Sequence, residues 1–311
     1  MPKLDGGNFG TKFGYQIDKF TDTVGFEDST HTYFDLEDGS KYISVTQLVH
    51  MYQPIFDSQF WASYKACEAI LGDRFRPLKS QLLSNKVWKD DYLIDYSIDI
   101  NLFKAEKEKV LQSYKDKAEE ACSHGTNVHN MMENLFYQKD EARLKRFGLG
   151  GKIEVPKGYY KLDKEYAAYP EIMISYKADD YLKVVGTADL VIKDGNEITL
   201  YDYKTNKSID KESYFDRASK KREMLKYPLN HIMSSNYWVY TLQLSLYMYM
   251  IEKMNPKFKC KKLALIHIDR DFNETEYECP YLKDEVIKML LHYRKINKSK
   301  MELDKDKPII F

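Results

Sequence analysis

From about residue 58 to residue 124 the chain carries apolar side chains mainly at helical spacing. Residues 58–71 repeat them every three or four positions, and residues 103–122 form an amphipathic run rich in Lys and Glu. This spacing is typical of helices with one buried face. We predict a helical lobe from residue 58 onward, a break at residues 123–125, and a new helix from Thr126.

A turn signal precedes this helical region. Residues 32–36 and 41–45 resemble strands and flank a turn at Asp38-Gly39, a pair that tolerates the positive φ angles of tight turns. We therefore expect a β-hairpin, followed by a helix capped by Ser44 or Thr46.

After residue 170 the apolar pattern changes to a period of two, which is typical of strands. Helices are expected at residues 236–254 and 282–295, and the polar, basic residues 204–226 predict a loop with a short helix. The expected strands are 171–174, 183–186, 188–192, 197–203 and 263–268, with a hairpin turn at Asp194-Gly195-Asn196. The pattern predicts an α/β protein.

Composition limits the partners. The 311 residues contain 48 Lys and Arg and 48 Asp and Glu, so the formal net charge is zero and any nucleic-acid surface must be local. The most apolar stretch, 242–251, is far shorter than the ~20 residues of a membrane span. We expect a cytoplasmic protein. The four cysteines are too dispersed to indicate a zinc knuckle or a disulfide framework.

Two acids and a lysine occupy the arms of the hairpin predicted around residue 195. Asp202 and Lys204 lie two residues apart and emerge on one face of a strand, and pairing of the arms can bring Asp189 beside them. Carboxylates are ligands for Mg²⁺ or Mn²⁺, which polarises a phosphoryl oxygen and lowers the pKa of a bound water. A nearby ammonium can orient that water. The cluster therefore indicates hydrolysis of phosphodiester bonds.

These residues make the sequence resemble the PD-(D/E)XK nuclease superfamily, specifically its RecB-like exonuclease branch, which includes phage-encoded and mitochondrial genome maintenance exonucleases. Residues 125–133 are similar to the branch's G-T-x-x-H-x-x-x-E motif, which implies that His129 is a metal ligand. The resemblance also implies a restriction-endonuclease-like mixed central sheet flanked by helices. It further implies metal ligation by Asp189, Asp202 and the carbonyl of Tyr203, and catalysis by Lys204.

Residues 240–247 are similar to the branch's Q-x-x-x-Y motif. Gln243 and Tyr247 are four residues apart on one helix face, where they could contact a substrate phosphate or order the surroundings of the lysine. Thr187-Ala188 stand where the superfamily's name has proline, a departure common in this branch. The chain lacks the clustered cysteines of relatives with an iron–sulfur cluster, so none is expected.

Ordinary structural roles remain open for each motif. An isolated Asp-x-Lys is usually a solvated strand face, and His129 alone would more often be a hydrogen-bonded helix residue. Gln243 and Tyr247 also suit an aromatic packing face. Glu171, which opens a strand, could be another ligand or a structural residue. The basic run 204–226 could be an exposed loop or a contact for a phosphate backbone.

Together these features predict an N-terminal hairpin and helical lobe over residues 1–122, narrowing access to a nuclease core over residues 123–311. The expected activity is metal-dependent exonuclease cleavage of DNA, single-stranded or at duplex ends, in phage or bacterial recombination, repair or genome processing. A structure-specific endonuclease, a catalytically silent DNA-binding subunit and a non-nuclease metal hydrolase are the alternatives. A recombinase or helicase partner is left open.

Overall fold

The computed structural model of the chain describes residues 10–157, 161–216 and 219–305. Its contacts divide into two compact units. One comprises residues 1–53, 127–213 and 224–311, and the other comprises residues 54–126 and 214–223. The first 53 residues therefore belong with the strand-rich unit. Whether residues 1–122 and 123–311 fold as separate domains stays a prediction.

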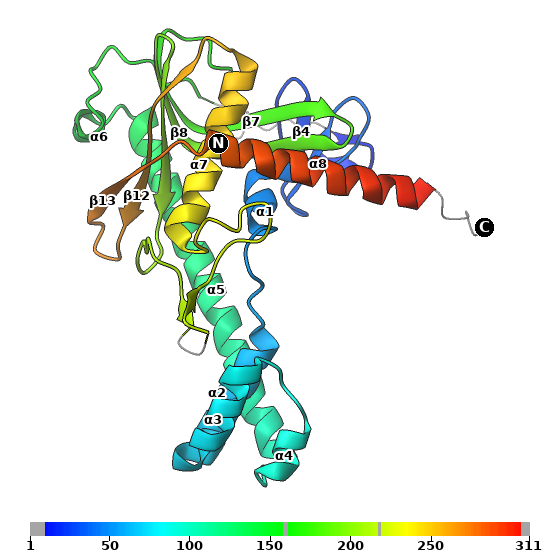
Figure 1. Cartoon of the computed structure of the whole chain (residues 1–311). Coiled ribbons are helices and arrows are strands. Elements are labelled where there is room, and N and C mark those ends of the chain that lie inside the picture. The colour runs from blue at the N-terminus through cyan, green and yellow to red at the C-terminus, as the bar shows by residue number, and fades with distance from the viewer. Residues whose placement is uncertain (1–9, 158–160, 217–218, 306–311) are drawn as a thin grey trace. The chain divides into compact units, whose positions relative to one another are not determined.

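A mixed six-stranded sheet forms the centre of the first unit (Figure 1). Its strand order is β13-β12-β9-β8-β6, and β7 pairs with the other side of β8. The β7–β8, β8–β9 and β12–β13 pairs are antiparallel, whereas β9–β12 and β6–β8 are parallel. The predicted α/β class is confirmed. The strands are β6 (Ile43–Ser44), β7 (Tyr166–Asp179), β8 (Leu182–Asp194), β9 (Glu197–Lys204), β12 (Lys259–Ile268) and β13 (Glu274–Cys279).

Strand β8 has two different neighbours along one of its sides. Residues 190–194 pair with β9, residues 184–185 pair with β6, and β7 accompanies β8 along its other side. Between these pairings, residues 186–189 have no strand partner on that side among the described residues. We call this opening the strand fork. At the strand fork, backbone N–H and C=O groups of β8 can form hydrogen bonds with side chains.

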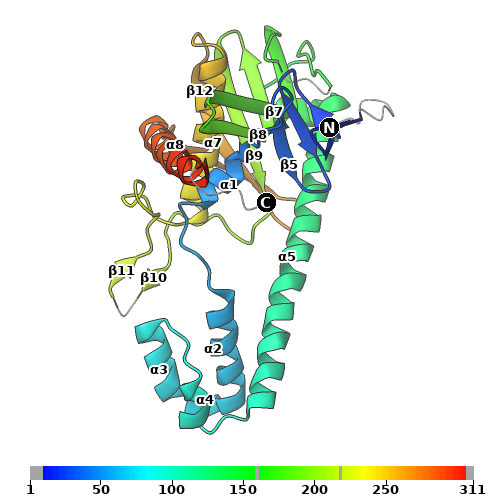
Figure 2. The ribbon, with the colours of Figure 1, turned by 90° about the vertical axis from the view of Figure 1, so that its right-hand side faces the viewer.

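Helices cover both faces of the sheet (Figure 2). On one face lie α7 (Asn236–Met254), α1 (Val45–His50) and α8 (Lys283–Lys305), which share a core with inward-facing strand residues. On the other face, the end of α5 (Ile100–Tyr137) and α6 (Glu141–Arg146) build a second core. Helix α7 is apolar all round because it packs against both the sheet and other helices.

A three-stranded sheet of β3 (Lys19–Phe20), β4 (Val24–Glu27) and β5 (Thr32–Asp35) belongs to the same unit, as do β1 (Thr11–Lys12) and β2 (Tyr15–Gln16). The predicted hairpin across Gly39 is confirmed but short. Phe34 bridges Lys41 antiparallel, and the backbone N–H groups of Asp35 and Tyr42 donate to the carbonyls of Ser40 and Tyr33; the second arm then ends because Ile43 and Ser44 pair with β8. Ser44 caps α1, as predicted, with a reciprocal bond to Gln47.

The second unit is mainly helical (Figure 2). It contains α2 (Ser58–Leu71), the 3-10 turn Gly72–Phe75, α3 (Arg76–Asn85), α4 (Asp91–Asp95) and the first part of α5. Its core consists of aromatic and aliphatic side chains from these helices. The short helix predicted within residues 204–226 was wrong, since the described residues there form strands β10 (Phe215–Asp216) and β11 (Lys221–Arg222).

The predicted helix break at residues 123–125 was also wrong. Helix α5 is continuous for 38 residues and includes Gly125. A glycine in a helix interior costs about 1 kcal/mol relative to alanine. The many good helix formers before it and the buried side chains Val128, Met132 and Phe136 after it offset that cost.

Candidate active site

Strands β7 and β8 depart from regular alternation at two facing residues. The register pairs Pro170 with Leu190 and Ile172 with Ala188, which places Glu171 opposite Asp189. Glu171 has a φ of 49°, in the left-handed region that costs a non-glycine residue about 1–3 kcal/mol. Tyr169 and Ile172, an odd number of positions apart, consequently reach the same core. Strained backbone of this kind is characteristic of functional sites.

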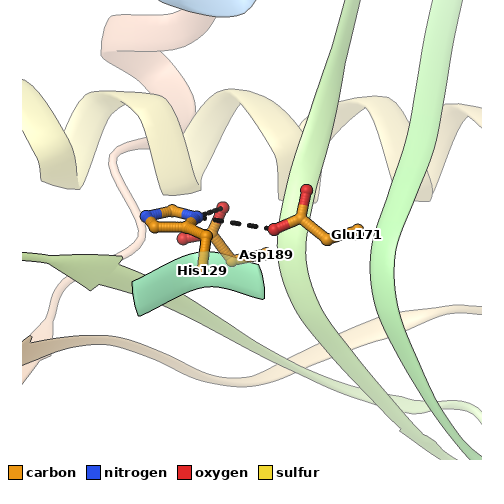
Figure 3. Close-up of side chains that lie close together, drawn as sticks. All are labelled: His129, Glu171 and Asp189. Carbon is orange, nitrogen blue, oxygen red and sulfur yellow. Dashed lines mark hydrogen bonds and ion pairs between the residues drawn. The ribbon is translucent and has the colours of Figure 1, made fainter. Parts of the chain in front are cut away.

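The kink places Glu171 beside Asp189 and beside His129 of α5 (Figure 3). His129 Nδ1 lies 3.4 Å from Glu171 Oε1 and 3.4 Å from Asp189 Oδ1. One ligand atom from each of the three residues falls within 4.8 Å of the others. Two carboxylates and an imidazole converging in this way can hold a metal ion.

Asp202 and Lys204 lie at the end of β9, where it leaves β8 at the strand fork. Their side chains form an ion pair in which Lys204 Nζ is 2.7 Å from Asp202 Oδ2. Asp189 Oδ2 accepts a 2.6 Å hydrogen bond from the backbone N–H of Tyr203. The side chain of Asp189 thus bonds the backbone between Asp202 and Lys204, and the strand geometry brings together the acids and lysine predicted from sequence.

The electrostatics of the site show an excess of negative charge. Burial raises the pKa of Asp202 to about 6, against the attraction of Lys204, and burial likewise raises the pKa of Glu171. Burial acts against a charged His129, but the Asp189 and Glu171 carboxylates outweigh it and raise the pKa of His129 to about 11. For Lys204, burial is outweighed by Asp202 and Asp189, so its pKa is raised. Cations are therefore favoured here.

Helix α7 supports the fork from one face of the sheet. The Tyr247 hydroxyl donates a 2.8 Å hydrogen bond to the carbonyl of Thr187, within the stretch of β8 that has no strand partner there. Gly186 makes room for this contact, because a Cβ atom at that position would lie 2.7 Å from the Tyr247 hydroxyl oxygen. Tyr247 therefore holds the backbone of the fork.

Two further side chains of α7 face the same region. Lys204 Nζ lies 4.5 Å from the centroid of the Tyr240 ring, within the range of a cation–π interaction. Gln243 is buried between the helical turns that carry Tyr240 and Tyr247. Its contact with a substrate stays a prediction, as does metal ligation by the Tyr203 carbonyl.

The sequence gives no reason to place Tyr240 beside the lysine, since its spacing suits a packing face or base stacking, and it leaves Glu171 between two roles. The available signal for Tyr240 was its position one turn before Gln243 on the motif face. For Glu171 it was a single acid inside an otherwise apolar strand. Neither signal reveals the backbone kink that brings Glu171 to His129.

A family model described as the PD-(D/E)XK nuclease superfamily matches residues 102–295, which is more than half of the chain. The chain belongs to the PD-(D/E)XK nuclease superfamily. The matched range includes all the site residues named above, from His129 to Tyr247. The mixed sheet with flanking helices is the fold expected for this superfamily.

Solved structures give more distant likenesses. A crystal structure of SSO0001 is 14% identical over 82% of this chain and 76% of its own, with a TM-score of 0.33. A putative exonuclease from Eubacterium rectale is 11% identical over 83% and 79%, with a TM-score of 0.29. A search of curated proteins finds no significant match. Among the helices of the described residues, none has the length and apolarity of a membrane span.

Proposed function

We propose that this nuclease is a metal-dependent deoxyribonuclease of the RecB-like branch that degrades DNA from an end. One observation carries the proposal: His129, Glu171 and Asp189 converge beside the Asp202–Lys204 pair at the strand fork. A bare solvated strand face, the ordinary alternative for an Asp-x-Lys pattern, does not suit Asp189 and Asp202, which are both buried.

The donor set fits a hard divalent cation. Carboxylate oxygens predominate, and they are the ligands that Mg²⁺ and Mn²⁺ prefer. Asp189, Asp202, Glu171 and His129 would hold the ion, whose charge would offset the cost that burial places on the ionised forms of Asp202 and Glu171. A bound divalent ion supplies Lewis-acid charge for a phosphoryl oxygen and lowers the pKa of nearby water.

The remaining chemistry belongs to Lys204. In the metal-free site Asp202 and Asp189 outweigh burial and raise the pKa of Lys204; its ammonium would orient the attacking water and balance charge on the phosphate. Asp202 fixes the position of Nζ, and the Tyr240 ring packs against it. Water is the nucleophile, and no covalent intermediate with the protein is required.

Preference for DNA and for ends rests on the resemblance to RecB-like exonucleases. A structure-specific endonuclease could use the same groups, because the surroundings of the site decide whether an end is required. A silent DNA-binding subunit is disfavoured, since the acids, the histidine and the lysine are all present and adjacent.

The test is gel analysis of linear and circular DNA, single- and double-stranded and labelled at either end, with Mg²⁺ or Mn²⁺. We expect loss of linear DNA alone, blocked by EDTA and by Lys204→Ala, with Lys257→Ala as the control at an exposed lysine outside the basic run. Cutting of circles would replace the exonuclease proposal with the endonuclease. Binding of DNA without cleavage under either metal would support the silent subunit.

A further inference from the structure

The imidazole of His129 lacks the support that usually fixes a metal-binding histidine. Its Nδ1 faces Glu171 and Asp189. The other ring nitrogen of such a histidine normally donates to a carboxylate or a backbone carbonyl, which sets the orientation of the ring. Within the described residues, Nε2 of His129 has no hydrogen-bond partner of this kind. The orientation of the ring therefore depends on the two contacts of Nδ1 and on packing.

The aromatic ring of Tyr203 supplies that packing. The Tyr203 and His129 rings meet at 89° with their centroids 5.9 Å apart. Tyr203 is 3% exposed, and its backbone N–H also bonds Asp189. One residue thus contacts the histidine through its ring and the aspartate through its backbone.

A buried cation fixes the Tyr203 ring in turn. The guanidinium carbon of Arg143, in α6, lies 5.4 Å from the Tyr203 ring centroid and 4.8 Å from that of Phe147. Arg143 is 6% exposed and forms an ion pair with Glu274 of β13. A planar guanidinium can stack on rings while it keeps such a pair, which an ammonium does less well.

We propose that Arg143 is a positioning residue that acts through the Tyr203 ring to hold His129 in the orientation required for metal binding. The inference rests on the proposed function, because it assumes that His129 is a metal ligand. Arg143 contacts Phe136, Phe147, Tyr203 and Glu274, and among the described residues its side chain shows no contact with His129, Glu171 or Asp189; its effect passes through the Tyr203 ring.

Arg146 provides a matched control on the same helix. It also pairs with Glu274 and lies 5.6 Å from the Phe147 ring, but the structure shows no contact between Arg146 and Tyr203. A general effect of removing a guanidinium from α6 should appear in both variants, whereas an effect on His129 should appear only at Arg143.

The experiment measures Mn²⁺ binding by calorimetry and ¹⁴N coupling to bound Mn²⁺ by pulsed electron paramagnetic resonance. Arg143→Lys should weaken binding about tenfold and alter the histidine coupling, in line with other residues that support metal ligands. Arg146→Lys should bind within about twofold of wild type. In a His129→Ala background, adding Arg143→Lys should change the affinity by no more than about twofold.

Equal weakening by Arg143→Lys with and without His129, or an unchanged affinity in a folded variant, would overturn the inference. Should Arg143→Lys fail to fold by circular dichroism, Tyr203→Leu, which keeps the backbone groups and removes the ring, is subject to the same criteria. Failure of wild-type protein to bind Mn²⁺ would instead remove the proposed function.

Discussion

Two clusters of buried charge in the sheet-containing unit have opposite electrostatic character. In the first, Lys177 Nζ lies 2.8 Å from Asp35 Oδ2, and Lys183 Nζ lies 3.1 Å from Asp38 Oδ2. In the second, Glu171, Asp189 and Asp202 surround one lysine and one histidine. In the first cluster each lysine has a carboxylate of its own, with the exposed Asp180 3.8 Å from Lys183 as a third acid, whereas in the second three buried or half-buried carboxylates share one lysine and one histidine.

Two of the three carboxylates in the second cluster differ from Asp35 in the direction of their pKa. At Asp35, burial would raise the pKa, but hydrogen bonds from Lys177 and the Glu37 backbone outweigh it and lower the pKa. At Asp202 and Glu171, burial prevails and the pKa is raised, whereas at Asp189 the attraction of His129 and Lys204 outweighs burial and lowers the pKa. Carboxylates that each pair with a lysine are typical of a structural role. Carboxylates whose ionised form is disfavoured by burial are typical of a functional site, here one that binds a cation.

The largest expected difference between the two clusters is in the rate of DNA cleavage after one acid of each cluster is neutralised. Asp202→Asn should lower the rate of DNA cleavage by about 10³-fold or more, because it removes a metal ligand and the anchor of Lys204. Asp35→Asn should leave the rate within about threefold of wild type, since Asp35 contacts no site residue. Initial rates on labelled linear DNA measure both. If both variants fold and lose the same fraction of the cleavage rate, the two clusters do not differ in function.

For Asp35 we expect the substitution to change the free energy of unfolding rather than the rate of cleavage. Its loss leaves the buried Lys183 and the partly exposed Lys177 with fewer counter-charges, so Asp35→Asn should destabilise the fold by about 2–3 kcal/mol. Because the folded pKa of Asp35 is lowered, its contribution is present above the unfolded pKa of about 3.9 and disappears as the pH falls below it. Urea unfolding at pH 7 and pH 3 tests this. A destabilisation of equal size at both pH values would contradict it.

The smallest effect is expected at Glu171. Its raised folded pKa means that ionised Glu171 costs stability, and this cost appears as the pH rises from the unfolded value of about 4.3 through the folded one. Glu171→Gln should therefore stabilise the metal-free protein by about 1 kcal/mol at pH 7 and leave it unchanged at pH 3. Urea unfolding in EDTA measures this change in the free energy of unfolding. If Glu171→Gln destabilised the protein at pH 7, Glu171 would have a structural role.

Much of the site could be predicted from the sequence because its spacing rules are local. Asp202 and Lys204 share a strand face by their separation of two, and the Gly195 turn sets the arms that bring Asp189 near them. The helix of residues 236–254 was predicted with the bounds it has, since its largely apolar run contains neither Gly nor Pro and ends before Asn255-Pro256.

Other features depend on contacts distant in sequence. The kink at Glu171 requires a non-glycine residue with positive φ, which no spacing rule indicates. Strand β13 is an edge strand with few buried residues, so its apolar signal is weak. The helix break expected before Thr126 was overruled by packing of the following turns, and the link from Arg143 to Tyr203 joins α6 to β9 across sixty residues of sequence.

The most direct test of the central claim is a calorimetric titration of metal-free protein with Mn²⁺, carried out on wild type, Asp189→Asn and Asp35→Asn. If the cluster of Glu171, Asp189 and Asp202 binds the metal, we expect saturable Mn²⁺ binding by wild type and by Asp35→Asn, and binding weakened at least about tenfold in Asp189→Asn. Equal binding by wild type and Asp189→Asn, or no binding by folded wild-type protein, would contradict the assignment of His129, Glu171 and Asp189 as a metal site.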